Sequence, residues 1–154
     1  MALEEGDVAP DFTLPTDGGD SISLSALKGK PVVLYFYPKD DTPGCTKEAC
    51  GFRDAQADFS SIGATVIGVS KDSVAKHDKF KAKYELNFPL AADEDGTVCE
   101  AYGTWVEKSM YGRKYMGIDR ATFLIDADGK LAKIWRKVKV PGHVEAVQAA
   151  LKDL

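Results

Sequence analysis

Two cysteines that lie five residues apart follow a loop rich in proline, aspartate and glycine. The loop ends in Thr42-Pro43, a pair typical of a helix N-cap followed by proline at the first helical position. Cys45 then falls in the first helical turn, where unpaired backbone N–H groups and the positive end of the helix dipole stabilise a thiolate. This setting favours a reactive nucleophile over a buried structural cysteine.

The spacing of Cys45 and Cys50 limits when they can form a disulfide. On an intact helix, residues five apart point about 140° from each other and lie roughly 8–9 Å apart, Cα to Cα. A disulfide needs less than about 7 Å. The two thiols can therefore bond only if the first turns unwind. Because Cys45 shares a helical face with the apolar Phe52, we expect it to point inward and Cys50 to point outward.

The patterns along the chain predict the elements that position these cysteines. Continuously apolar runs at residues 32–37 and 64–70 predict buried parallel strands, joined by one helix over residues 45–62 that ends at Gly63. The other predicted elements are a hairpin of residues 12–14 and 21–24, a helix at 73–84, an edge strand at 88–91, a helical turn at 97–102, a long loop at 103–119, a hairpin of residues 122–125 and 131–138, and a last helix after Gly142. This order predicts an α/β fold, a three-layer α/β/α sandwich with a mixed central sheet and an N-terminal β-hairpin extension. The thioredoxin-like fold has this order.

Composition argues against several functions. The 154 residues predict a single domain, residues 1–154. With 20 basic and 24 acidic residues and no basic patch, the chain is not expected to bind nucleic acid or an anionic membrane. No apolar run approaches the roughly 20 residues of a membrane span, and the acidic N-terminus does not resemble a signal peptide. Three cysteines are too few for a disulfide scaffold, which favours a reducing compartment.

The histidines and remaining motifs predict no cofactor and no metal. His77 shares a helical face with Phe80 and Tyr84 and is expected in the core, whereas His143 begins the last helix and is expected at the surface. The sequence shows no zinc-type ligand spacing, phosphate loop, haem motif or flavin motif.

The residues around Cys45 resemble the peroxiredoxin active-site motif, Pro38-x-x-x-Thr42-x-x-Cys45. Residues 6–14 resemble the lead-in of that family, and residues 117–126 resemble its second active-site segment. The Cys45/Cys50 spacing and the run Lys108-x-Met110-Tyr111-Gly112 are similar to the bacterioferritin comigratory protein/peroxiredoxin Q branch. The resemblance covers nearly the whole chain and implies a thiol-dependent peroxidase that reduces hydrogen peroxide and organic hydroperoxides.

The resemblance implies a role for each matching residue. Cys45 is the peroxidatic nucleophile, whose thiolate becomes a sulfenic acid. Thr42 orients the peroxide, a role that is compatible with simple helix capping, and Arg120 stabilises the thiolate and the departing oxygen. Pro38 shapes the pocket and shields the sulfenic acid. Glu48 holds Arg120 through a charge-assisted hydrogen bond, unless it is a solvated helix residue.

The resemblance also implies that Cys50 is the resolving cysteine, which converts the sulfenic acid into an intramolecular disulfide. The alternative for Cys50 is an inert exposed thiol. Some members of this branch place the resolving cysteine on another helix, so Cys99 is a competitor as well as a candidate core residue or free thiol.

The implied partners are a peroxide substrate and thioredoxin or a similar dithiol reductant. An intramolecular pair needs no second subunit, so we expect a monomer in the cytoplasm, or in an organellar stroma if a transit peptide was removed. Two other functions stay open, a general disulfide oxidoreductase and a non-catalytic thiol redox sensor. The oxidoreductase usually carries Cys-x-x-Cys and a proline before the hairpin strand, where this chain has four intervening residues and Arg120-Ala121.

Overall fold

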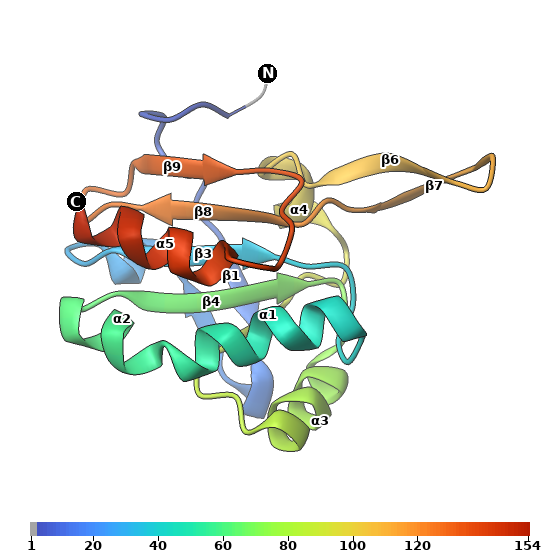
Figure 1. Cartoon of the computed structure of the whole chain (residues 1–154), viewed down its shortest axis with the longest axis horizontal. Coiled ribbons are helices and arrows are strands. Elements are labelled where there is room, and N and C mark those ends of the chain that lie inside the picture. The colour runs from blue at the N-terminus through green and yellow to red at the C-terminus, as the bar shows by residue number, and fades with distance from the viewer. Residues whose placement is uncertain (1–2) are drawn as a thin grey trace.

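A mixed five-stranded sheet forms the centre of the fold, with strand order β5-β4-β3-β8-β9 (Figure 1). The computed structural model describes residues 3–154, so the first two residues of the predicted domain lie outside the described part. The strands are β1 Thr13–Pro15, β2 Ser21–Ser23, β3 Val32–Phe36, β4 Thr65–Ser70, β5 Leu90–Ala92, β6 Trp105–Met110, β7 Arg113–Ile118, β8 Ala121–Ile125 and β9 Leu131–Trp135. The α-helices are α1 Pro43–Asp54, α2 Gln56–Ile62, α3 Val74–Tyr84, α4 Thr97–Ala101 and α5 His143–Lys152.

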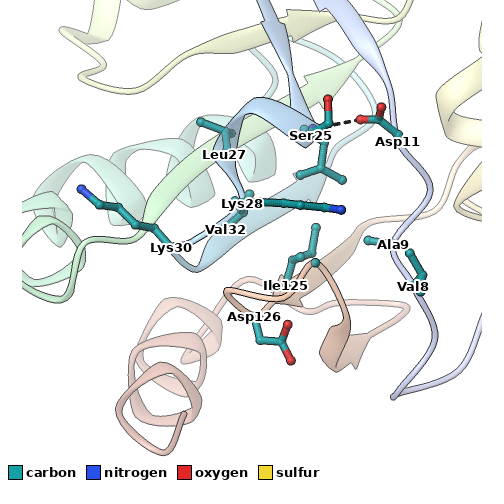
Figure 2. Close-up of a pocket in the computed structure, with 12 residues that line it drawn as sticks. Val8, Ala9, Asp11, Ser25, Leu27, Lys28, Lys30, Val32, Ile125 and Asp126 are labelled. Atoms are coloured by element: carbon teal, nitrogen blue, oxygen red, sulfur yellow. Dashed lines mark hydrogen bonds between the residues drawn. The ribbon is translucent and has the colours of Figure 1, made fainter.

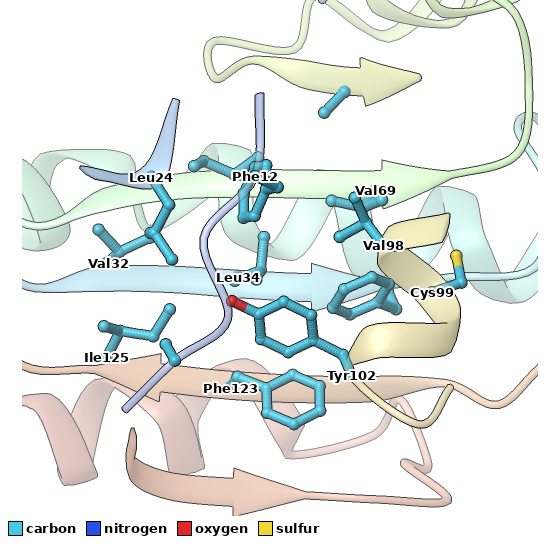
Figure 3. Packing of buried hydrophobic residues seen from close by; sticks show 14 of the residues in the cluster. Phe12, Leu24, Val32, Leu34, Val69, Val98, Cys99, Tyr102, Phe123 and Ile125 are labelled. Carbon is cyan, nitrogen blue, oxygen red and sulfur yellow. The ribbon is translucent and has the colours of Figure 1, made fainter. Parts of the chain in front are cut away.

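The central strand β3 is buried on both faces, because its side chains alternate between two core layers. Leu34 and Phe36 point into one layer, closed by the β1–β2 hairpin and α4, which we call the Cys99 layer after its cysteine (Figure 3). Val33 and Tyr35 point into the other, closed by α1, α2, α3 and α5, which we call the Cys45 layer. The predicted three-layer α/β fold with its N-terminal hairpin is confirmed.

Strand pairing brings two distant segments of the chain together. β3 pairs in parallel with β4 and antiparallel with β8, and Phe36 at the end of β3 lies opposite Ala121 at the start of β8. The loop that follows β3 and the residue that precedes β8 therefore meet at the same end of these two central strands. The first leads to Cys45 and the second is Arg120.

The predicted single helix over residues 45–62 is wrong, because Ala55 interrupts it between α1 and α2. The side chain of Asn87 donates a hydrogen bond to the carbonyl of Arg53, 3.2 Å away. In an unbroken helix that carbonyl would accept the N–H of Ala57, four residues later. At the break, the side chain of Asn87 thus bonds this carbonyl from outside the helix.

The predicted loop at residues 103–119 is also wrong, because it forms the β6–β7 hairpin. Both faces of the hairpin are largely exposed toward its tip, so its sequence lacks the apolar alternation that predicts strands. The turn residues Tyr111 and Gly112 both have positive φ, 51° and 77°, as a tight two-residue hairpin turn requires.

Candidate active site

Cys45 lies in the first turn of α1 and is only 2% exposed. Thr42 precedes the helix in an extended conformation, and its carbonyl accepts the first helical hydrogen bond from the N–H of Thr46 at 2.8 Å. The predicted placement of Cys45 at the amino end of a helix, facing inward, is confirmed.

Arg120, just before β8, extends from this end of the strands to the sulfur of Cys45. Its Nη2 donates to Cys45 Sγ at 3.3 Å, and its Nη1 donates to Glu48 Oε1 at 2.7 Å. A Cβ on Gly44 would lie 3.2 Å from Nη2, so the glycine in the first turn leaves room for the guanidinium. Burial lowers the pKa of Arg120, but the charges of Glu48 and Cys45 outweigh it, and the side chain stays a cation.

Glu48 is fully buried one helical turn after Cys45. One carboxylate oxygen binds Arg120, whereas Oε2 has no hydrogen-bond partner within residues 3–154. Burial raises the pKa of Glu48 to about 7, and the neighbouring guanidinium only partly offsets this effect. Glu48 is thus a buried partner of Arg120, and the alternative of a solvated helix residue is wrong.

Thr42 and Pro38 lie differently from the other predicted residues. Thr42 is the N-cap residue of α1, as predicted, but its Oγ1 donates to the carbonyl of Lys39 at 2.9 Å and makes no capping hydrogen bond to the helix. Pro38 is exposed in the bend after β3, outside the buried layer around Cys45. Its shielding role stays a prediction.

The other two cysteines lie in contrasting environments. Cys50 is partly exposed on α1, which runs without interruption from Pro43 to Asp54. All three cysteines are free thiols, and the helix keeps Cys45 and Cys50 too far apart for a disulfide. Cys99 is fully buried in the opposite core layer (Figure 3), where burial raises the pKa of its thiol well above the ordinary value and Asp93 raises it further.

A buried network that sequence reasoning missed fixes the loop before α1. Asp40 accepts the hydroxyl of Tyr37 at 2.5 Å and contacts His77 Nδ1 at 2.6 Å through its second oxygen. The other ring nitrogen of His77 lies 3.0 Å from the carbonyl of Ala91, and the N–H of Asp40 donates to Asp72 at 2.8 Å. Only an aspartate in the loop and an inward-facing histidine on α3 signalled this network. His77 is in the core, as predicted.

His143 is buried at the start of α5, so its predicted surface position is wrong. Its Nε2 lies 2.7 Å from Thr122 Oγ1, and its ring packs edge-on against Phe52 and Trp135. Burial, and to a smaller extent the charge of Arg120, lower the pKa of His143 to about 4. The ring is therefore a neutral packing residue beside the site.

A cavity of about 120 Å³ lies at the other end of the sheet, at the start of β3 and the end of β8 (Figure 2). Leu24, Lys28, Val32 and Ile125 are among its lining residues, and none of the predicted site residues lines it. Within residues 3–154, no three His, Cys, Asp or Glu side chains are grouped so that they could hold a metal ion. No helix of the described part combines the length and the apolar content needed to cross a bilayer.

The chain is similar to several known proteins. The model of the AhpC/TSA family matches residues 6–134. Peroxiredoxin Bcp of Bacillus subtilis is 52% identical over 154 residues, covering 100% of this chain and 98% of that protein. A solved structure of the bacterioferritin comigratory protein of Xanthomonas campestris, which was studied for its alkyl peroxide reduction activity, is 46% identical to this chain. The match covers 92% of this chain and 90% of that protein's chain, with a TM-score of 0.89. A cysteine-to-serine mutant of PrxQ from Xylella fastidiosa is 41% identical and covers 99% and 98%, with a TM-score of 0.94.

Proposed function

Because the chain belongs to the AhpC/TSA family and is a peroxiredoxin similar to Bcp and PrxQ, we propose that Cys45 is its peroxidatic nucleophile. The observation that carries this assignment is the contact of one guanidinium, that of Arg120, with both Cys45 Sγ and Glu48. A fixed cation at the amino end of a helix stabilises a thiolate and the negative charge that develops on a departing oxygen.

In the proposed first step, the Cys45 thiolate attacks the terminal oxygen of the peroxide. A sulfur–oxygen bond forms while the oxygen–oxygen bond breaks, so the sulfur is oxidised to a sulfenic acid. The departing oxygen takes up a proton and leaves as water or an alcohol. Arg120 is oriented for this step by its hydrogen bond to Glu48.

Thr42 has a proposed role that follows from its hydrogen bond. Its hydroxyl proton is already donated to the carbonyl of Lys39, so the oxygen is left to accept a hydrogen bond. A peroxide O–H is a suitable donor. We therefore assign to Thr42 the role of orienting the peroxide. Pro38, in the loop that precedes α1, is proposed to cover the sulfenic acid on Cys45.

In the proposed second step, α1 unwinds and the thiolate of Cys50 attacks the sulfur of the sulfenic acid. A Cys45–Cys50 disulfide forms, and hydroxide leaves and is protonated to water. Cys99 is the weaker candidate for this step, because the central sheet separates its layer from Cys45. Two thiol–disulfide exchanges with a reduced dithiol, thioredoxin in our proposal, restore both thiols and oxidise the dithiol.

Residues 1–154 form a single domain, and the chain acts as a monomer, because the resolving thiol lies on the same chain. It needs no cofactor, because sulfur is the redox centre. Its place is the cytoplasm or a comparable reducing compartment.

The proposal is tested by following peroxide consumption with thioredoxin, thioredoxin reductase and NADPH. We expect many turnovers per chain with hydrogen peroxide and with an organic hydroperoxide, and none with Cys45→Ser. A single stoichiometric oxidation would support a redox sensor instead. Insulin reduction without peroxide turnover would support a disulfide oxidoreductase.

A further inference from the structure

The β6–β7 hairpin extends beyond the body of the molecule and carries much of its exposed apolar surface (Figure 1). Four of the seven exposed large hydrophobic side chains in residues 3–154 lie on it. They are Met110, Tyr111, Tyr115 and Met116, exposed by 56%, 99%, 44% and 49%. Grouped exposed apolar side chains of this kind usually mark an interaction surface.

The strand register separates the hairpin into two unlike faces, because directly paired residues share a face and successive residues alternate. We call one the Met110 face, which consists of Val106, Lys108, Met110, Arg113, Tyr115 and Gly117. The opposite one is the Met116 face, which consists of Trp105, Glu107, Ser109, Lys114, Met116 and Ile118.

The two faces differ in charge as well as in apolar content. The Met116 face contains an ion pair between Glu107 and Lys114, 3.6 Å apart. The Met110 face contains cations and no carboxylate. Lys108 on that face donates to the carbonyl of Ile118, so Arg113 is the cation left for a partner. The Met110 face is therefore apolar and basic, although the whole chain carries a net charge of −4.

The base of the hairpin fixes its position beside the active site. Lys71 lies 4.0 Å above the ring of Trp105, and Ile118 is buried in the Cys99 layer. After β7 the N–H of Asp119 donates to the carbonyl of Thr104 at 2.7 Å, and the next residue is Arg120. Because the Trp105 side packs on the Cys99 layer, the Met110 face at the base is turned away from that layer.

We propose that the Met110 face docks the protein dithiol that reduces the Cys45–Cys50 disulfide, through a partner surface that is apolar with acidic groups at its margin. This proposal rests on the proposed function, in which such a partner must approach this end of the sheet. Met, Tyr and Arg are the side-chain types enriched at protein interfaces. The basic face also matches a partner of the opposite sign.

The size of the face favours a transient partner over a second copy of the chain. Six residues of strand span about 20 Å, and two strands are about 10 Å wide, which gives on the order of a few hundred Å². A stable interface buries about 800 Å² per partner, whereas redox encounters lie at the small end of the range.

The test compares variants of the two faces with the disulfide form of the chain and reduced bacterial thioredoxin as the probe. For the double variant Met110→Ser/Tyr115→Ser, we expect at least a tenfold lower kcat/KM for thioredoxin. Its rates of oxidation by hydrogen peroxide and of reduction by dithiothreitol should stay within twofold of the wild type. The matched control Met116→Ser should stay within twofold in every measurement.

A charge arm tests the assignment of Arg113. Arg113→Glu should lower kcat/KM for thioredoxin several-fold at low ionic strength, and the loss should shrink as salt is added. The same reversal on the other face, Lys114→Glu, should have less than half of that effect.

Several results would overturn the docking proposal. They are an unchanged kcat/KM for thioredoxin in the double variant, an equal loss in Met116→Ser, and an equal loss with dithiothreitol. The proposal would also be overturned if the wild type formed a dimer, or bound anionic lipid vesicles, and the double variant lost that property while its thioredoxin kinetics stayed the same. Failure of the proposed function would look different, because the wild type would then form no Cys45–Cys50 disulfide with peroxide.

Discussion

Arg120 is the residue on which the geometry of the site depends. Its guanidinium lies between a sulfur and a carboxylate, and Gly44 leaves the space that it occupies. A planar side chain with several donors suits this position better than lysine, which carries a point charge. The motif identified Arg120 from sequence, but its distance from Cys45 follows from the pairing of β3 with β8.

Replacing Arg120 by methionine should lower kcat/KM for hydrogen peroxide by about 10²–10³, because one positioned donor to a developing negative charge contributes that much. Stopped-flow oxidation of the variant measures the change. Arg136→Met is the matched control, since Arg136 bonds the carbonyls of Tyr102 and Gly103 away from the sulfur. Equal losses in both variants would contradict the role of Arg120.

Glu48 should make the stability of the fold depend on pH. Its pKa is raised by burial from 4.5 to about 7, so its contribution is complete below pH 4.5 and is lost as the pH rises through 7. Between pH 4.5 and 7, the unfolding free energy of the wild type should fall relative to that of Glu48→Gln by up to about 3 kcal/mol. Urea unfolding at several pH values measures it, and a constant difference would contradict the assignment.

Among the elements around the site, α3 holds the loop that precedes α1. Asp40 is bonded to α3 through His77, and Asp41 accepts hydrogen bonds from Lys83 and Tyr84 of the same helix. Asp41 has a φ of 59°, a conformation that aspartate tolerates better than most residues. The loop can therefore stay in place while α1 changes conformation.

His77→Gln should lower the unfolding free energy by about 3 kcal/mol, because it leaves buried Asp40 without its charged partner. Burial opposes protonation of His77, but the hydrogen bond and the charge of Asp40, together with smaller contributions from the Ala91 carbonyl and Asp72, raise its pKa above 6.5. The stabilisation by His77 is thus complete below pH 6.5 and is lost as the pH rises through the raised value. Chemical unfolding should show this loss in the wild type and not in the variant.

His143→Gln is the control for that experiment, because its effect has the opposite sign. The pKa of His143 is lowered to about 4, so its contribution is present above pH 6.5 and is lost as the pH falls toward 4. If His77→Gln instead changed the slope only below pH 6.5, the assignment of His77 would be wrong.

The break at Ala55 should limit how far the helix unwinds during the reaction. α2 keeps Phe59 fully buried and ends in a left-handed glycine, so it is secured independently of α1. We expect disulfide formation to lower the hydrogen-exchange protection of amides at 46–54 and to leave those at 59–62 unchanged. Loss of protection across both helices, or across neither, would contradict this.

At the scale of the whole molecule, the apolar runs predicted the central sheet because buried strands must be apolar on both faces. The run at 32–37 and the helix start at Thr42-Pro43 were enough to place Cys45. The β6–β7 hairpin was missed because its outer residues bury little. His143 was missed because its burial depends on Phe52, which is distant in sequence, and on Trp135, which belongs to another element, the strand β9. Contacts of this kind leave no local pattern.

The two core layers also determine which thiols can meet. Cys45 and Cys50 share α1, whereas Cys99 lies beyond the central sheet. Unwinding α1 is a local change, whereas Cys99 would have to leave a fully buried position in the other core layer. The proposed pairing of Cys45 with Cys50 is therefore favoured by the fold as well as by their spacing.

Disulfide mapping by mass spectrometry after one equivalent of hydrogen peroxide shows which cysteine resolves the sulfenic acid on Cys45. The wild type and Cys99→Ser should each form one intramolecular disulfide between residues 45 and 50. Cys50→Ser should form none and should carry a sulfenic acid on Cys45 that dimedone traps. An intramolecular disulfide that involves Cys99, in the wild type or in Cys50→Ser, would contradict the proposed pairing of Cys45 with Cys50. A Cys45 that peroxide leaves unmodified would contradict its role as the nucleophile.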